Sequence, residues 1–199
     1  ASGAMSGGGM QVHAYTAHEP VGVAGLIIPW NGPAGTFIIK VAPALAAGCS
    51  VVVKPSELTP ITALWIAELA AEAGVPPGVL NVLPGLGNVA GQALVDHVDV
   101  DKISFTGSTA VGKHIVKSAA SNLKRVTLEL GGKSPCIVFD DADMDVAIPG
   151  AGMAIFANSG QVCFAGSRLF VQKKSYEKVV EGVAKFASSL KVGSGFDPE

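Results

Sequence analysis

Two side chains of the second half of the chain are candidates for covalent and acid–base chemistry. Cys163 follows the run Gly160-Gln161-Val162, and a thiolate at that point would be a strong nucleophile. A single cysteine in an apolar context is more often packed in a core. Residue type alone therefore leaves both interpretations of Cys163 open.

Glu129 is the second candidate, in the run Leu128-Glu129-Leu130-Gly131-Gly132. An acid inside an apolar strand end is costly to bury unless it has a partner or a function. Partial burial would make this carboxylate a better proton acceptor, as a general base requires. The alternative is a solvated glutamate on an edge strand.

Two glycine-rich loops are candidates for binding a phosphate. Residues 85–90, GLGNVA, fit the dinucleotide pattern G-x-G-x-x-A, although a tight strand-to-helix turn explains them equally well. The acidic residue that should follow about twenty positions later is missing. Residues 105–113, FTGSTAVGK, also link a strand to a helix. There Gly107 would allow an anion to approach the backbone closely, and Ser108 would offer it a hydroxyl and a backbone N–H. The alternative is an ordinary capped helix start.

The elements that must position these residues alternate regularly along the chain. Short β-branched runs predict strands, and Ala/Leu-rich stretches predict helices. The strands are expected at 21–28, 51–53, 80–83, 102–105, 126–130, 136–139 and 168–172, and the helices at 37–47, 59–74, 88–95, 108–120, 143–158 and 175–190. Strands alternating with helices predict parallel β-α-β units in a doubly wound α/β sheet. For the helix at 59–74 we expect Thr59 as the N-cap.

Composition excludes several classes of protein. The net charge of −2 gives no reason to expect nucleic acid or an anionic membrane as a partner. Three widely spaced cysteines argue against a disulfide framework or a zinc site and favour a reducing, cytoplasmic setting. The acids Asp140, Asp141, Asp143 and Asp145 are expected to form a helix N-terminus, not a metal site. Charged residues make up only 15%, so we expect further protein to cover part of the surface. The chain does not begin with Met and stops in the turn-rich run SGFDPE, so we expect both ends to be cut from a longer chain.

Five phrases in order resemble the aldehyde dehydrogenase superfamily. They are IIPWNGP (27–33), VVVKPSELTP (51–60), FTGSTAVG (105–112), LELGGKSP (128–135) and SGQVCFAGSR (159–168). The resemblance extends from about Pro20 to the last residue. It implies a Rossmann-like nucleotide-binding domain over residues 21–131, the start of an α/β catalytic domain over 132–199, and part of an oligomerisation arm over 1–20.

The resemblance also implies the chemistry of oxidation of an aldehyde to a carboxylic acid. Cys163 matches the catalytic nucleophile, Glu129 the general base that activates water, and Asn31 the amide that holds the oxyanion together with the Cys163 backbone N–H. Two alternatives stay open: a relative that transfers the acyl group to coenzyme A, which tends to lack the Glu129 base, and a non-catalytic nucleotide-binding fragment.

A nicotinamide cofactor is part of the same implication. Lys54 and Glu57 match positions that contact the adenosine ribose, and a carboxylate there favours NAD over NADP, with NADP still possible. The other residues that the resemblance assigns to the cofactor are Ile28, Trp30, Gly87, Gly107, Ser108, Gly112 and Leu130. Gly107 to Gly112 would lie by the pyrophosphate and Gly87 near the adenine.

Gly32 departs from the family pattern. Many relatives carry a bulky aromatic residue after the Pro-Trp-Asn triplet, where it lines the aldehyde tunnel. A glycine there predicts a wider entrance and a bulky or aromatic aldehyde as substrate, with Val162 and Phe164 also shaping the pocket. For the full-length parent we expect a homodimer or a homotetramer.

Overall fold

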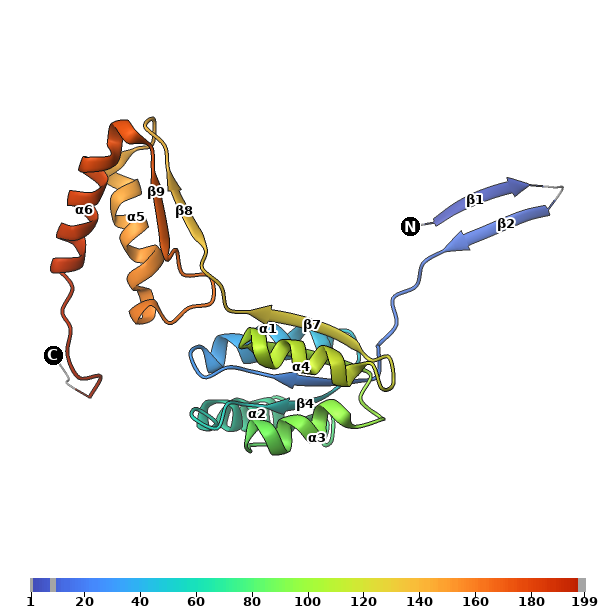
Figure 1. Cartoon of the computed structure of the whole chain (residues 1–199). Helices are drawn as coiled ribbons and strands as arrows, with labels where there is room; N and C mark the ends of the chain where they lie inside the picture. The colour runs from blue at the N-terminus through green and yellow to red at the C-terminus, as the bar shows by residue number, and fades with distance from the viewer. Residues whose placement is uncertain (1, 8–9, 197–199) are drawn as a thin grey trace. The chain divides into compact units, whose positions relative to one another are not determined.

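The computed structural model describes residues 2–7 and 10–196 and divides the chain into two compact units, Ala1–Glu129 and Leu130–Glu199. Each unit is an α/β structure (Figure 1). In the first unit a hairpin, β1 (Ser2–Gly7) and β2 (Met10–Tyr15), precedes a five-stranded sheet and its helices. These are β3 (Val23–Ile27), α1 (Pro33–Ala46), β4 (Ser50–Lys54), α2 (Ile61–Glu72), β5 (Leu80–Val82), η1 (Gly87–Gly91), α3 (Gln92–Asp96), β6 (Lys102–Gly107), α4 (Thr109–Ala119) and β7 (Arg125–Leu130).

The sheet has the strand order β5-β4-β3-β6-β7. Strand β3 pairs in parallel with β4 on one side and with β6 on the other, so that Ile27 lies opposite both Lys54 and Phe105. The chain therefore winds outward in one direction through β4 and β5, then returns to the other side of β3 with β6. This order confirms the predicted doubly wound fold and places its topological switch point between β3 and β6.

Alternate residues of β3 pack against helices on opposite faces of the sheet. Ala24 and Leu26 belong to a buried cluster with Phe37 and Val41 of α1. The residue between them, Gly25, faces α3, because a Cβ at this position would lie 3.1 Å from Leu94. Burial on both faces is why these strands are apolar throughout and do not alternate.

The second unit contains a parallel pair of strands and two packed helices. Strand β8 (Pro135–Val138) pairs with β9 (Arg168–Val171), and α5 (Met144–Phe156) packs against α6 (Tyr176–Ser188). Short 3-10 turns, η2 (Ala157–Gly160) and η3 (Lys173–Ser175), follow α5 and precede α6. Asp143 caps α5 by accepting a hydrogen bond from the Asp145 N–H at 3.0 Å, which confirms the prediction that these acids begin a helix.

One local prediction was wrong, one was confirmed only in part, and one element was not predicted. Thr59 does not cap α2; Pro60 takes that position, and the Thr59 hydroxyl donates instead to the Trp30 carbonyl at 3.3 Å. The helix predicted at 88–95 begins as a π-helical turn and becomes α-helical only at Gln92. The β1–β2 hairpin was not predicted, because glycines interrupt the alternating pattern of its sequence.

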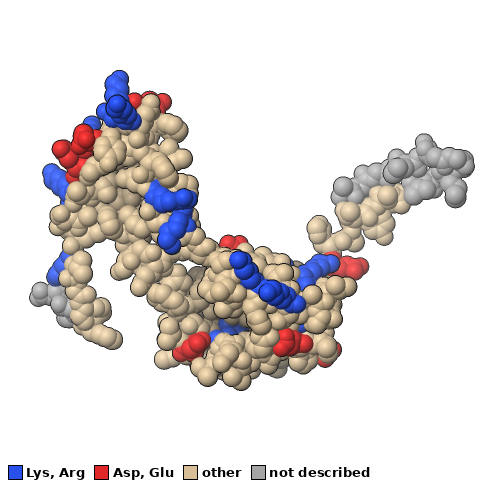
Figure 2. All heavy atoms as spheres, in the orientation of Figure 1, with Lys and Arg blue, Asp and Glu red and all other residues tan. Residues whose placement is uncertain are grey.

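The surface of the first unit carries large apolar side chains. On and just before α2, Leu58, Ile61 and Trp65 are 73%, 77% and 61% exposed. Charged side chains are correspondingly sparse on the face shown in Figure 2, which fits their low share of the sequence. Among the described residues, the helices are all too short or too polar to cross a membrane.

Candidate active site

The residues predicted to bind a cofactor in the first unit follow the carboxyl ends of neighbouring strands. Ile28, Trp30 and Asn31 follow β3, Lys54 and Glu57 end or follow β4, and Gly107 and Ser108 end or follow β6. Neighbouring loops are bonded to one another: the Ile28 N–H donates to the Lys54 carbonyl at 3.1 Å. In doubly wound sheets, ligands bind in the crevice outside these strand ends, at the switch point.

A charged pair lies at the carboxyl end of β4, the strand on the other side of β3 from the switch point. The Lys54 Nζ is 3.0 Å from the Glu57 Oε2, and the lysine side chain is buried while that of the glutamate is 46% exposed. The pKa of the Glu57 carboxyl is lowered by a hydrogen bond from its own backbone N–H and by Lys54. Glu57 is therefore ionised at neutral pH and presents a fixed carboxylate acceptor at the carboxyl edge.

The second glycine-rich loop begins helix α4. Ser108 is its N-cap, because the Ser108 Oγ accepts from the Val111 N–H at 3.3 Å. The first turn of α4 contains no acidic residue, so the positive end of the helix dipole is not compensated by a side chain there. Gly107 has a packing reason as well, since a Cβ there would lie 2.5 Å from the Phe105 ring. Gly112 lies within the first turns of α4 and is buried.

The first glycine-rich loop has an unusual backbone. Gly87 begins the π-helical turn η1, and a Cβ at Gly87 would meet no atom within 4 Å. Gly85 is more restricted, because a Cβ there would lie 2.8 Å from the Ala90 Cβ. π-Helical turns occur often at functional sites. This loop follows β5, so it lies at the same carboxyl edge as the loops after β3 and β4.

Glu129 lies near the carboxyl end of β7, the edge strand of the sheet, and is exposed. The partial burial expected from its apolar neighbours is therefore not observed. The reason is the alternation of β7, in which Val126 and Leu128 face inward while Thr127 and Glu129 face outward. This arrangement matches the alternative of a solvated acid on an edge strand.

A buried lysine near Glu129 was missed by the sequence analysis. Lys40 of α1 is 9% exposed, and its Nζ donates to the Ser104 Oγ of β6 at 2.6 Å. Burial lowers the pKa of the Lys40 ammonium below its ordinary value, and the charge of Glu129 acts in the opposite direction. The available signal was a single lysine within the apolar run Phe37-Ile38-Ile39-Lys40-Val41.

Cys163 and Leu130 belong to the second unit. Cys163 is exposed within a tight turn that the Ala165 N–H closes by donating to the Val162 carbonyl at 3.1 Å. The other two cysteines differ from it: Cys49 is buried and Cys136 is half-buried. Of the three cysteines, Cys163 is the most exposed to solvent.

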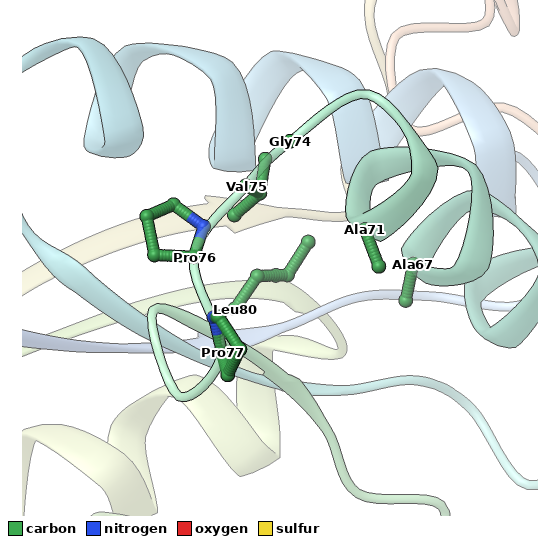
Figure 3. Close-up of a pocket in the computed structure, with 7 residues that line it drawn as sticks. All are labelled: Ala67, Ala71, Gly74, Val75, Pro76, Pro77 and Leu80. Atoms are coloured by element: carbon green, nitrogen blue, oxygen red, sulfur yellow. The ribbon is translucent and has the colours of Figure 1, made fainter.

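One surface hollow lies away from these loops. It has a volume of about 390 Å³ and lies between the end of α2 and the segment that leads into β5 (Figure 3). Its lining is apolar and has no titratable side chain: Ala67, Ala71, Gly74, Val75, Pro76, Pro77 and Leu80. It therefore offers no chemistry. Within residues 2–7 and 10–196, no three His, Cys, Asp or Glu side chains gather as a metal site.

The fold and the loops at its carboxyl edge define a protein of the doubly wound, Rossmann-like class. The pattern of the aldehyde dehydrogenase family matches residues 2–199. The chain therefore belongs to the aldehyde dehydrogenase family.

Curated relatives and solved structures agree with this assignment. An aldehyde dehydrogenase of Enchytraeus buchholzi is 55% identical over 94% of the chain and 38% of the relative. Retinal dehydrogenase 2 of Homo sapiens is 56% identical over 92% of the chain and 36% of the relative. Aldehyde dehydrogenase, cytosolic 1, of Rattus norvegicus is 55% identical over 94% of the chain and 37% of the relative. The chain thus spans less than two fifths of the length of these relatives.

Several of the similar solved structures contain bound NAD+. The aldehyde dehydrogenase of Bacillus cereus in complex with NAD+ is 52% identical, with a TM-score of 0.86 over 91% of this chain and 37% of that one. Betaine aldehyde dehydrogenase of Staphylococcus aureus, also in complex with NAD+, is 46% identical, with a TM-score of 0.86 over 91% and 36%.

Proposed function

We propose that the protein oxidises an aldehyde to the corresponding carboxylic acid, with NAD+ as the hydride acceptor and Cys163 as the nucleophile. The observation that carries the proposal is the gathering of Asn31, Lys54, Glu57 and Ser108 at one carboxyl edge, in a chain of the aldehyde dehydrogenase family. The exposed thiol of Cys163 supports it too, because a nucleophile must be reachable by its substrate.

The residues at the carboxyl edge suit NAD+. The N-terminus of α4 carries no acid in its first turn and so favours the pyrophosphate. The Glu57 carboxylate would accept hydrogen bonds from the two ribose hydroxyls and would repel a 2′-phosphate. Ile28 and Trp30 would line the same crevice, with Gly87 on the adenine side and Gly107, Gly112 and Leu130 completing the contacts. The relatives from Bacillus cereus and Staphylococcus aureus, whose structures contain NAD+, support this choice.

The chemistry would begin at Cys163. Its thiolate Sγ attacks the aldehyde carbon, and the new oxyanion accepts hydrogen bonds from the Asn31 amide and the Cys163 backbone N–H. Bound NAD+ supplies the acceptor for the hydride that leaves this carbon, which gives a thioester. Glu129 then takes a proton from water, the hydroxide attacks the thioester carbon, and Cys163 leaves as a thiolate.

The first test is NADH formation, followed at 340 nm in the protein at its natural full length. We expect wild-type activity without coenzyme A, and its loss in Cys163→Ala. An activity that requires coenzyme A would favour the acyl-transferring alternative. An inactive wild type under both conditions would favour a non-catalytic nucleotide-binding protein.

We propose further that the substrate is a bulky or aromatic aldehyde. Gly32 is the N-cap of α1, next to the proposed oxyanion donor Asn31. A Cβ at Gly32 would meet only the Thr36 Oγ1, at 3.8 Å, so the space beside Gly32 is open. The test compares kcat/KM for acetaldehyde and benzaldehyde, with benzaldehyde expected to be preferred. Equal values would contradict the proposal.

We propose also that the protein is a cytoplasmic homo-oligomer. Residues 1–20 would form an arm that binds a partner subunit in a homodimer or homotetramer, because a two-stranded hairpin has little stability alone and Tyr15 is 70% exposed. The three free cysteines, together with the cytosolic relative from rat, support a cytoplasmic location.

A further inference from the structure

The loop that joins α5 to β9 (Figure 1) contains three successive residues in the left-handed region, directly after Ala157. The φ angles of Asn158, Ser159 and Gly160 are 50°, 56° and 72°. In the described part of the chain only three non-glycine residues have a positive φ, and two of them are Asn158 and Ser159. L-residues visit this region singly and at a cost, so a run of this kind needs something to hold it.

Asn158 is placed to hold the run. Its Nδ2 donates to the Gln161 carbonyl at 3.3 Å, and the Gln161 N–H donates back to the Asn158 carbonyl at 3.0 Å. Asparagine is also one of the few L-residues that tolerate the left-handed conformation. The two bonds close a four-residue turn that ends two residues before Cys163.

The far end of the loop is fixed to the same helix. The Gly166 N–H donates to the Ala154 carbonyl of α5 at 2.8 Å. A Cβ at Gly166 would lie 3.2 Å from the Cβ atoms of both Ala154 and Cys136. Gly160 passes equally close to α5, with its virtual Cβ 3.1 Å from the Ile155 carbonyl oxygen. The exposed Cys163 therefore lies between two anchors on the last turns of α5.

We propose that Asn158 is a positioning residue for Cys163. The hydrogen bond from its side-chain amide to the Gln161 carbonyl maintains the left-handed turn that sets the direction of the thiol. This inference rests on the proposed role of Cys163 as the nucleophile. A shift of the thiol by about 1 Å is enough to slow a reaction by about 100-fold, since the attack requires alignment.

The test uses Asn158→Asp in the protein at its natural full length. Aspartate has the same size and tolerates a positive φ, but its carboxylate cannot donate to the Gln161 carbonyl. We expect kcat to fall about 10- to 100-fold while KM for NAD+ stays within about twofold, because Asn158 is not among the residues proposed to contact NAD+. The rate of Cys163 alkylation by iodoacetamide, read by mass spectrometry of its peptide, should change in parallel.

Two further variants make the result specific. In Asn158→Gly the backbone adopts a positive φ easily but the side-chain amide is absent, so kcat should also fall. Full activity in this variant would overturn the role of the side-chain hydrogen bond. Asn122→Asp is the matched control, since it removes side-chain amide hydrogen bonds to the Val98 and Val100 carbonyls in the other unit, and its kcat should equal that of the wild type. Full activity in Asn158→Asp would refute this proposal alone, provided that Cys163→Ala is inactive. Activity in Cys163→Ala would refute the proposed function and this inference together.

Discussion

Replacing Glu57 by glutamine should weaken the preference for NAD+ over NADP+. The Glu57 carboxylate is ionised at neutral pH, lies 3.0 Å from the buried Lys54 ammonium and is 46% exposed. A 2′-phosphate in the same crevice would bring a second negative group close to it. The glutamine side chain keeps the size and the hydrogen-bonding capacity but removes the repulsive charge.

The magnitude follows from the exposure of Glu57. Two unit charges about 4 Å apart interact by about 1 kcal/mol in bulk water and about 4 kcal/mol at an effective dielectric constant of about 20. A half-exposed carboxylate lies nearer the first value, and the neighbouring Lys54 ammonium offsets part of its field. We therefore expect the ratio of kcat/KM for NAD+ to that for NADP+ to fall roughly 5- to 30-fold, which corresponds to about 1–2 kcal/mol.

The assay measures kcat/KM for both cofactors in wild type, Glu57→Gln and Glu68→Gln. Glu68 is an exposed glutamate of α2 outside the carboxyl-edge loops, so its variant controls for the loss of a charge. The melting temperature of Glu57→Gln must also be measured, because the change leaves a buried Lys54 without its partner. An unchanged cofactor ratio in a folded Glu57→Gln protein would refute the assignment of Glu57 to the ribose.

Two predictions concern stability and assembly. Lys40→Met should raise the free energy of unfolding by about 1 kcal/mol at pH 7, because it removes a buried ammonium. Since the pKa of Lys40 is lowered in the folded state, the unfolded chain binds more protons between that pKa and the ordinary value, and wild-type stability rises with pH there. In urea titrations, the difference in the free energy of unfolding between variant and wild type should be smaller at pH 10 than at pH 7. A larger difference at pH 10 would contradict the prediction. Deletion of residues 1–20 should reduce the molar mass by light scattering to that of a smaller oligomer or a monomer, and an unchanged mass would exclude the arm as the assembly contact.

Local sequence patterns predicted most of the elements, because buried strands and amphipathic helices differ in the spacing of their apolar residues. The runs at 51–53 and 102–105 each became a parallel strand of the central sheet. Predictions failed where a distant contact competed with a local one. Thr59 has the chemistry of an N-cap, but its hydroxyl is used by the Trp30 carbonyl, 29 positions away in the sequence.

The sequence by itself determined the type of residue at each candidate position and the alternation that predicts a doubly wound sheet. It could do so because residue chemistry and periodicity are local properties. Only the tertiary structure decided which strands are neighbours, and so that Lys54 and Phe105 both flank Ile27. It also decided that Lys40 is buried against Ser104 and that Glu129 is exposed. Burial and pairing between distant segments depend on how the whole chain packs, and no local pattern contains that information.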